Sequence, residues 1–180
     1  AVTRNCRLAA VRSFVQHLLR HDVTRAGQYG RILAIRNKKA LRRAATYLEP
    51  EEARAVIAAI DRRSRNGERD HALLLFLYNS GARVSEAASL RISDIDWHAR
   101  SVRIMGKGSK ERRCPLWPNT IEHLRRLVDN RPHDAHVFLN RRGEPITRYG
   151  IHTMVERYVA KLRATSPSLR GKRISPHVIR

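Results

Sequence analysis

The stretch HALLLFLYNSGARVSE, residues 71–86, decides the fold of this chain. Its first eight residues are almost continuously apolar and lack β-branched side chains, a pattern that predicts a buried helix. Gly81 ends that helix, and a second short helix is expected from about Val84 to Leu90. Arg83 therefore stands just after a break and near a helix start, where neighbouring backbone N–H groups add positive potential around its side chain.

Further elements are expected on both sides of this stretch. Pro50 and Pro118 each occupy a position typical of the first residue of a helix, and Thr147 can cap another. Residues 101–105 and 112–116 alternate as two strands around a glycine-containing turn. The sequence thus predicts a mainly α fold with a small antiparallel β-hairpin sheet, of the α+β class.

The beginning of the chain has a different organisation. Apolar residues recur at helical spacing over residues 8–19, surrounded by arginines, which predicts an amphipathic helix with a basic outer face. Residues 22–30 are broken by turn formers, and the basic run that follows is interpreted as a linker. We therefore expect two parts, a helix with a basic linker over residues 1–43 and a second domain over residues 44–180.

Charge is the most informative property of the composition. The 180 residues include 37 Lys and Arg against 16 Asp and Glu, a formal net charge of +21. Such a chain calls for a polyanionic partner, and nucleic acid is the default. No run approaches the roughly 20 apolar residues of a membrane span, and the N-terminal stretch lacks the apolar centre of a signal peptide, so a cytoplasmic location is expected. Cys6 and Cys114 form neither a disulfide framework nor a zinc site.

Three separate segments carry residues suited to phosphate chemistry, namely NSGARVSE (79–86), GKGSKER (106–112) and SPHVIR (175–180). Cleavage of a phosphodiester concentrates negative charge on the non-bridging oxygens, and a protein without a metal must place fixed donors there. Arg83 suits this task because a guanidinium is always charged and offers paired N–H donors. Glu86 falls on the same helical face three residues later and could hold Arg83 in place.

The other two segments complete the predicted set. Ser175 is a good helix N-cap, which puts His177 and Arg180 on one face near the positive end of a short helix. Lys107 lies between two glycines at the tip of the predicted hairpin and could reach a leaving oxygen. A lysine with a pKa near its usual value of about 10.4 is protonated at neutral pH and ready to donate, but charge alone does not separate Lys107 from Lys110.

In this order and setting, the three segments resemble those of the tyrosine recombinases, the phage integrase family, which break and rejoin DNA through a covalent phosphotyrosyl link. The resemblance implies that Arg83 and Arg180 clamp the scissile phosphate, with Glu86 in support. It also implies that His177 assists proton transfer and binding, and that Lys107 rather than Lys110 protonates the departing 5′ hydroxyl.

The sequence also bears on metals, cofactors and partners. No metal and no nucleotide cofactor are expected, because no ligand cluster or phosphate-binding glycine loop is visible. The family resemblance implies that the partner is double-stranded DNA and that the full-length protein works as a homotetramer on two duplexes. The remaining cations expected to contact DNA are Lys38, Lys39, Arg42, Arg43, Lys110, Arg112, Arg113, Lys172 and Arg173.

The family resemblance also implies what the chain lacks. Family members place their nucleophilic tyrosine beyond the His-x-x-Arg motif, which here ends at Arg180. All five tyrosines precede His177 and are expected to be structural. The chain is therefore interpreted as a catalytic-domain fragment that binds DNA without cleaving it, and residues 1–43 resemble the last helix and exit linker of the family's core-binding domain.

Two alternatives stay open from the sequence alone. A catalytically inactive DNA-binding accessory protein could keep the same scaffold and the same charge. An RNA-binding protein of ribosomal type would explain the charge but would leave the ordered Arg, Lys and His-x-x-Arg segments as coincidence.

Overall fold

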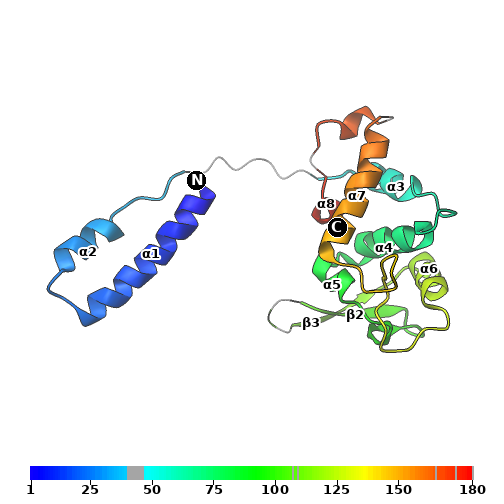
Figure 1. Cartoon of the computed structure of the whole chain (residues 1–180), viewed down its shortest axis with the longest axis horizontal. Helices are drawn as coiled ribbons and strands as arrows, with labels where there is room; N and C mark the ends of the chain where they lie inside the picture. Colours follow the sequence, from blue (N-terminus) through cyan, green and yellow to red (C-terminus); the bar gives the residue numbers. More distant parts are fainter. Residues whose placement is uncertain (40–46, 107, 109, 165, 173, 180) are drawn as a thin grey trace. The chain divides into compact units, whose positions relative to one another are not determined.

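The computed structural model describes residues 1–39, 47–106, 108, 110–164, 166–172 and 174–179, with the side chain of His177 left out. The chain divides into two compact units, Ala1–Ala45 and Thr46–Arg180 (Figure 1). Of the helices in the described residues, none is both long enough and apolar enough to cross a membrane.

The first unit pairs a long helix with a short one. Helix α1 (Val2–His21) and helix α2 (Ala26–Leu33) pack together and bury Leu8, Val15 and Tyr29. The helix expected over residues 8–19 is confirmed. The turns expected over residues 22–30 are wrong from Ala26 onward, where helix α2 begins. Burial of Tyr29 outweighs the low helix propensity of the two glycines in α2.

Six α-helices and two 3-10 turns are described in the second unit (Figure 1). They are α3 (Pro50–Ala58), α4 (Gly67–Ser80), α5 (Val84–Ala88), η1 (Ile92–Asp94), α6 (Pro118–Val128), α7 (Arg148–Arg163), η2 (Pro167–Leu169) and α8 (Pro176–Ile179). Helix α4 is the central element, because α3, α5, α6 and α8 all pack against it. Its residues 72–77 are all buried, which explains why the apolar run of the sequence has no polar face.

A small antiparallel sheet lies beside these helices. Its strands are β1 (Ile95–Asp96), β2 (Ser101–Met105) and β3 (Glu111–Pro115), paired in the order β1-β2-β3. The predicted hairpin is confirmed, and the sheet gains one short strand, β1, that is too short to show a sequence pattern. The fold is therefore mainly helical with a small three-stranded antiparallel sheet, as predicted.

The junction between α4 and α5 positions Arg83. Gly81 ends α4 in the left-handed region, with φ of 59°, a conformation that glycine adopts without steric cost. The chain then turns within two residues, and Arg83 becomes the N-cap residue of α5 with extended backbone angles. The guanidinium is thereby presented at the end of a buried helix pair.

A buried carboxylate joins α4 to α7 on another side of the molecule. Asp70 is fully buried and accepts hydrogen bonds from Arg157 Nη2 at 2.8 Å and from Tyr158 Oη at 2.9 Å. Arg69 binds the other oxygen of Asp70 and also donates to the backbone carbonyl of Leu139 at 2.9 Å. Burial, followed by the hydrogen bond to Asp70, raises the pKa of Tyr158, so its hydroxyl stays a donor. This network fixes α7, one of the two helices on which α5 and α8 rest.

Candidate active site around Arg83

Arg83 is held by a single neighbouring carboxylate. Its backbone N–H donates to Glu86 Oε2 at 2.7 Å, and its Nη1 donates to Glu86 Oε1 at 2.8 Å. The side chain of Arg83 remains 47% exposed. A guanidinium carries five N–H donors, so this arrangement fixes the direction of the group while leaving donors for an anion. The predicted support of Arg83 by Glu86 thus has a direct structural basis.

Glu86 serves two arginines at once. Arg112, from β3, donates through Nη2 to Glu86 Oε2 at 2.7 Å and through Nη1 to Oε1 at 3.2 Å. The Glu86 side chain is only 6% exposed. Burial on its own would raise the pKa of Glu86, but the hydrogen bonds from Arg112 and Arg83 outweigh burial and lower the pKa to about 2. The carboxylate is therefore ionised at neutral pH, and the three groups together carry one net positive charge.

The turn of the hairpin begins against this cluster. A Cβ atom placed on Gly106 would lie 3.5 Å from Arg112 Nη1 and 3.8 Å from Arg83 Nη1. The N–H of Gly106 donates to the carbonyl of Lys110 at 2.8 Å and closes the turn. Lys107 itself lies outside the described residues. Its neighbour Gly106 nevertheless shows that the turn starts beside both guanidinium groups.

The predicted helix at the His-x-x-Arg motif is present as α8. Pro176 and Ile179 are buried, and the N–H of Val178 donates to the carbonyl of Ser175 at 2.9 Å. Both α5 and α8 pack on the same two helices, α4 and α7 (Figure 1). The side chain of His177 and the whole of Arg180 lie outside what the structure describes, so the convergence of the four predicted catalytic residues stays a prediction.

Lys172 is anchored within the protein. Its Nζ lies 2.6 Å from Glu52 Oε2 in the first turn of α3 and 5.7 Å from the centre of the Tyr47 ring. The hydrogen bond from Lys172 is the largest of the effects that lower the pKa of Glu52. Lys172 therefore ties the loop that precedes α8 to α3.

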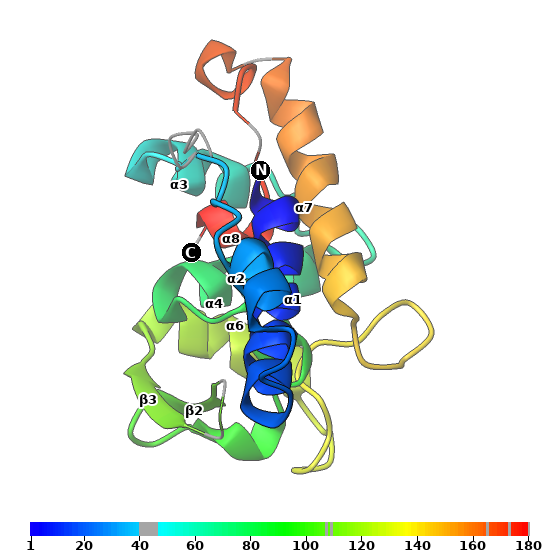
Figure 2. The same cartoon turned by 90° about the vertical axis from the view of Figure 1, so that its left-hand side faces the viewer.

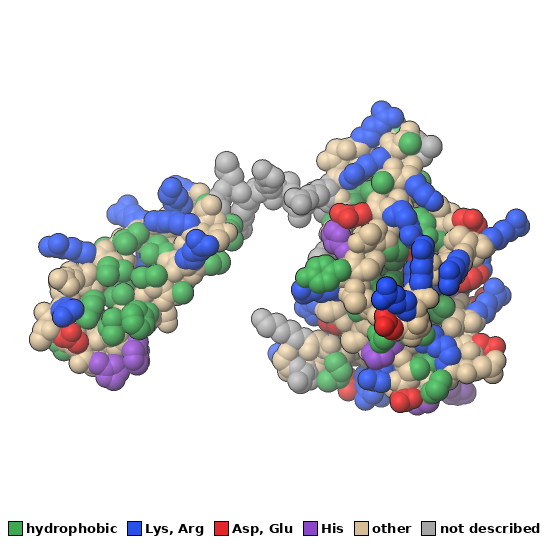
Figure 3. Space-filling model, in the orientation of Figure 1, with side chains coloured by type: hydrophobic (Ala, Val, Ile, Leu, Met, Phe, Trp, Pro, Cys, Tyr) green, Lys and Arg blue, Asp and Glu red, His purple; other side chains and the backbone are tan. Residues whose placement is uncertain are grey.

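The other cations predicted to bind DNA lie at different places. Lys38 and Lys39 are exposed in the first unit, and Lys110 and Arg113 are exposed on the hairpin. Arg42, Arg43 and Arg173 lie outside the described residues. Figure 3 shows Lys and Arg side chains spread over the visible surface of each unit, rather than gathered at the hairpin alone. Their contacts with DNA remain predictions.

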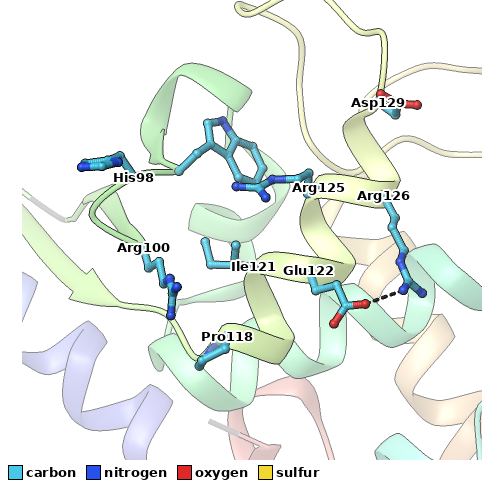
Figure 4. A pocket seen from close by; sticks show the side chains of 9 residues that line it. His98, Arg100, Pro118, Ile121, Glu122, Arg125, Arg126 and Asp129 are labelled. Carbon is cyan, nitrogen blue, oxygen red and sulfur yellow. Dashed lines mark hydrogen bonds and ion pairs between the residues drawn. The ribbon is translucent and has the colours of Figure 1, made fainter.

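A hollow of about 770 Å³ lies away from the predicted residues, between the β1–β2 turn and α6 (Figure 4). The guanidinium of Arg125 lies 5.8 Å from the centre of the Trp97 ring, and Arg126 pairs with Glu122. None of the predicted site residues lines this hollow. Trp97 is also packed against the hydrophobic core.

The family is shown by comparison with known proteins. Residues 46–180 match the phage integrase family, so the chain belongs to that family. The chain is 36% identical to a tyrosine recombinase XerC of Pelobacter propionicus over 97% of its own length and 56% of that protein. It is 35% identical to a tyrosine recombinase XerC of Pelotomaculum thermopropionicum, over 97% of its length and 58% of that protein. The chain spans between about half and two thirds of the curated relatives that it matches.

Solved structures support the same fold. The Tn1549 transposon integrase in complex with a circular intermediate DNA aligns with a TM-score of 0.74 and 17% identity, over 99% of this chain and 64% of that one. The XerH site-specific recombinase bound to its difH substrate aligns with a TM-score of 0.60 and 25% identity, over 78% of this chain and 42% of that one. These structures agree with the family resemblance, which is confirmed by the match of residues 46–180 to the phage integrase family.

Proposed function

We propose that this chain is part of a site-specific recombinase that cleaves and rejoins duplex DNA through a 3′-phosphotyrosyl intermediate. The observation that carries the proposal is the half-exposed guanidinium of Arg83, fixed at two points by a buried, ionised Glu86. Fixed donors of this kind stabilise the charge that develops on a phosphate during in-line displacement, without reorganisation at the moment of reaction. The membership of residues 46–180 in the phage integrase family also supports the proposed recombinase function.

In the proposed reaction, a tyrosine hydroxyl attacks the phosphorus and the bond to the 5′ oxygen breaks. Arg83 and Arg180 bind the non-bridging oxygens, and His177 assists the removal of the proton that the attacking tyrosine hydroxyl loses. Lys107 gives its proton to the departing 5′ oxygen, so that a free hydroxyl leaves. Rejoining reverses the sequence, and the phosphotyrosyl link conserves the bond energy, so neither a metal nor a nucleotide cofactor is required.

The 180-residue chain by itself is proposed to bind DNA without cleaving it, because each of its tyrosines precedes the His-x-x-Arg motif. Residues 1–43 would act as the end of a DNA-clamping domain, and residues 44–180 as the catalytic domain without its last part. The full-length protein is proposed to act in the cytoplasm as a tetramer on two duplexes.

The test uses the reading frame extended past Arg180 and a nicked duplex selected for tight binding from a random-sequence pool. A covalent protein–DNA adduct should accumulate with the extended protein and not with the 180-residue chain, although both should bind. Arg83→Ala should slow adduct formation by about a hundredfold or more. Arg54→Ala is the matched control, because Arg54 is 67% exposed on α3 and pairs only loosely with Glu51 at 3.7 Å.

Two results would count against the proposal. An Arg83→Ala rate equal to that of the parent would remove Arg83 from the site. Binding without any adduct in the extended protein would favour the alternative of an inactive DNA-binding accessory protein on this scaffold.

A further inference from the structure

Arg112 points toward the body of the protein, unlike its neighbours on β3. Along this strand Arg112 and Cys114 are half-buried, whereas Glu111 and Arg113 are exposed. The strand register sets Arg112 opposite Ile104, which is buried. Because successive side chains of a strand point to opposite faces, Arg113 cannot reach the groups that Arg112 contacts.

The partner of Arg112 is the carboxylate that also holds Arg83. Both Nη atoms of Arg112 donate to Glu86, one to each oxygen, across 26 residues of sequence. Paired N–H donors on a carboxylate restrict orientation as well as distance. The β2–β3 hairpin is thus fixed to the first turn of α5, where Arg83 begins the helix.

Gly106 places the start of the hairpin turn beside this link. Its Cα faces both guanidinium groups closely enough that an added Cβ would meet Arg112 Nη1 at 3.5 Å and Arg83 Nη1 at 3.8 Å. The backbone on the other side of the turn is close as well, because the same Cβ would lie 3.3 Å from the carbonyl oxygen of Lys110. The first residue of the turn, Gly106, therefore lies next to the side chains of Arg83 and Arg112.

We propose that Arg112 is a positioning residue, which through Glu86 fixes the hairpin that carries the proton donor relative to the phosphate clamp at Arg83. The inference rests on the recombinase function proposed above and deepens it. Loss of Arg112 leaves Glu86 with both of its hydrogen bonds from Arg83, so the clamp is retained. The hairpin stays anchored by Val102 and Ile104 in the core but loses its link to α5, and the defect falls on protonation of the leaving oxygen.

A change of leaving atom separates these two effects. An alkoxide is a poor leaving group that needs a proton, whereas a thiolate leaves without one because a thiol has a pKa of about 8.5. The substrate is therefore prepared in two forms, with oxygen or with sulfur at the bridging 5′ position of the scissile phosphate. In the protein extended past Arg180, Arg112→Met should slow adduct formation by about a hundredfold on the oxygen substrate, the low end of what a general acid contributes. On the sulfur substrate the Arg112→Met rate should lie within about threefold of the parent, since no proton is needed there.

Two further variants serve as comparisons for Arg112→Met. Arg103→Met removes the same charge from the same hairpin, but Arg103 is 46% exposed on β2 and pairs with Asp94 rather than Glu86, so this variant should leave both rates close to those of the parent. Arg83→Ala should be slow on both substrates, because the phosphate clamp is needed whatever the leaving atom.

Equal slowing of Arg112→Met on both substrates would overturn the proposal, as would an unchanged rate on the oxygen substrate. If Arg112→Met does not fold, Arg112→Lys tests the proposal in its place, because lysine keeps the charge and loses the paired donors. Arg112→Lys should slow adduct formation less on the oxygen substrate, and the sulfur substrate should again restore the rate. A parent protein that forms no adduct on either substrate would instead refute the recombinase function.

Discussion

Glu86→Gln tests the central electrostatic claim of the structure. The glutamine keeps the shape of the side chain and removes the charge that holds Arg83 and Arg112. The pKa of Glu86 falls from its ordinary value of 4.5 to about 2 in the folded protein. A difference of that size corresponds to roughly 3 kcal/mol of stability at neutral pH. The carboxylate is almost fully buried, but Arg83 and Arg112 are 47% and 36% exposed, so solvent screening makes this value an upper bound.

The pH dependence follows from the sign of the shift. A carboxyl group whose pKa is depressed by folding contributes fully above its unfolded pKa of 4.5, and the contribution is lost as pH falls toward about 2. The parent and Glu86→Gln should therefore differ by roughly 3 kcal/mol in free energy of unfolding at pH 7, by less than half of that near pH 3, and should converge as the pH falls to about 2. Taking the difference between the two proteins cancels every other titrating group.

Urea unfolding followed by tryptophan fluorescence measures this difference, because Trp97 and Trp117 both lie in the second unit. Urea is preferred to a guanidinium salt, which would screen the ion pairs. Glu111→Gln is the control on β3, where the carboxylate is 45% exposed and lies 4.0 Å from Arg113, and it should cost less than about 1 kcal/mol. A gap between parent and Glu86→Gln that stays constant from pH 7 to about pH 3 would refute the assignment.

Three other substitutions probe the scaffold. Asp70→Asn should destabilise the second unit by about 3 to 5 kcal/mol in urea unfolding, because it leaves buried arginine contacts without their counter-charge; a loss below about 1 kcal/mol would contradict this. Gly67→Ala should prevent stable folding, seen as loss of a cooperative thermal transition, because its Cβ would lie 2.0 Å from the carbonyl oxygen of Asp61. Burial is the largest of the effects that lower the pKa of His123 and of His71 beside it, so stability should fall as pH drops below about 6.5. His123→Leu should flatten that part of the melting-temperature profile, and an unchanged profile would assign it to other groups.

Much of the fold follows from local sequence signals. Pro50, Pro118 and Thr147 mark helix starts correctly, and Thr147 accepts the capping hydrogen bond from Gly150 at 3.1 Å. The apolar run before Gly81 gives the central helix, and the alternation over 101–105 gives the middle strand. These signals are local because proline, glycine and capping residues act on their own backbone.

The elements that the sequence did not reveal depend on contacts between distant residues. Helix α2 contains two glycines and is recognised only once Tyr29 is seen to be buried. Strand β1 has two residues and exists through its pairing with β2. Both are cases in which packing or pairing overrides weak local preference.

In the candidate site, too, local contacts could be predicted from the sequence and contacts between distant residues could not. The pairing of Arg83 with Glu86 could be predicted, because residues three apart share a helical face. The second arginine on Glu86 could not, because Arg112 comes from β3, and neither its charge nor its motif shows which way it points. Lys172 is a similar case, since the bond to Glu52 spans 120 residues.

The two-residue step from Gly81 to Arg83 has a consequence for engineering this family. Gly81 takes a backbone conformation that other residues resist, and Arg83 already belongs to the next helix. An extra residue inserted at this corner would rotate α5, which carries Arg83 and Glu86 together, and would move Glu86 away from Arg112 on β3, whatever side chain was added. Chimaeras between relatives should therefore be joined elsewhere, with the length of this corner kept as a fixed unit.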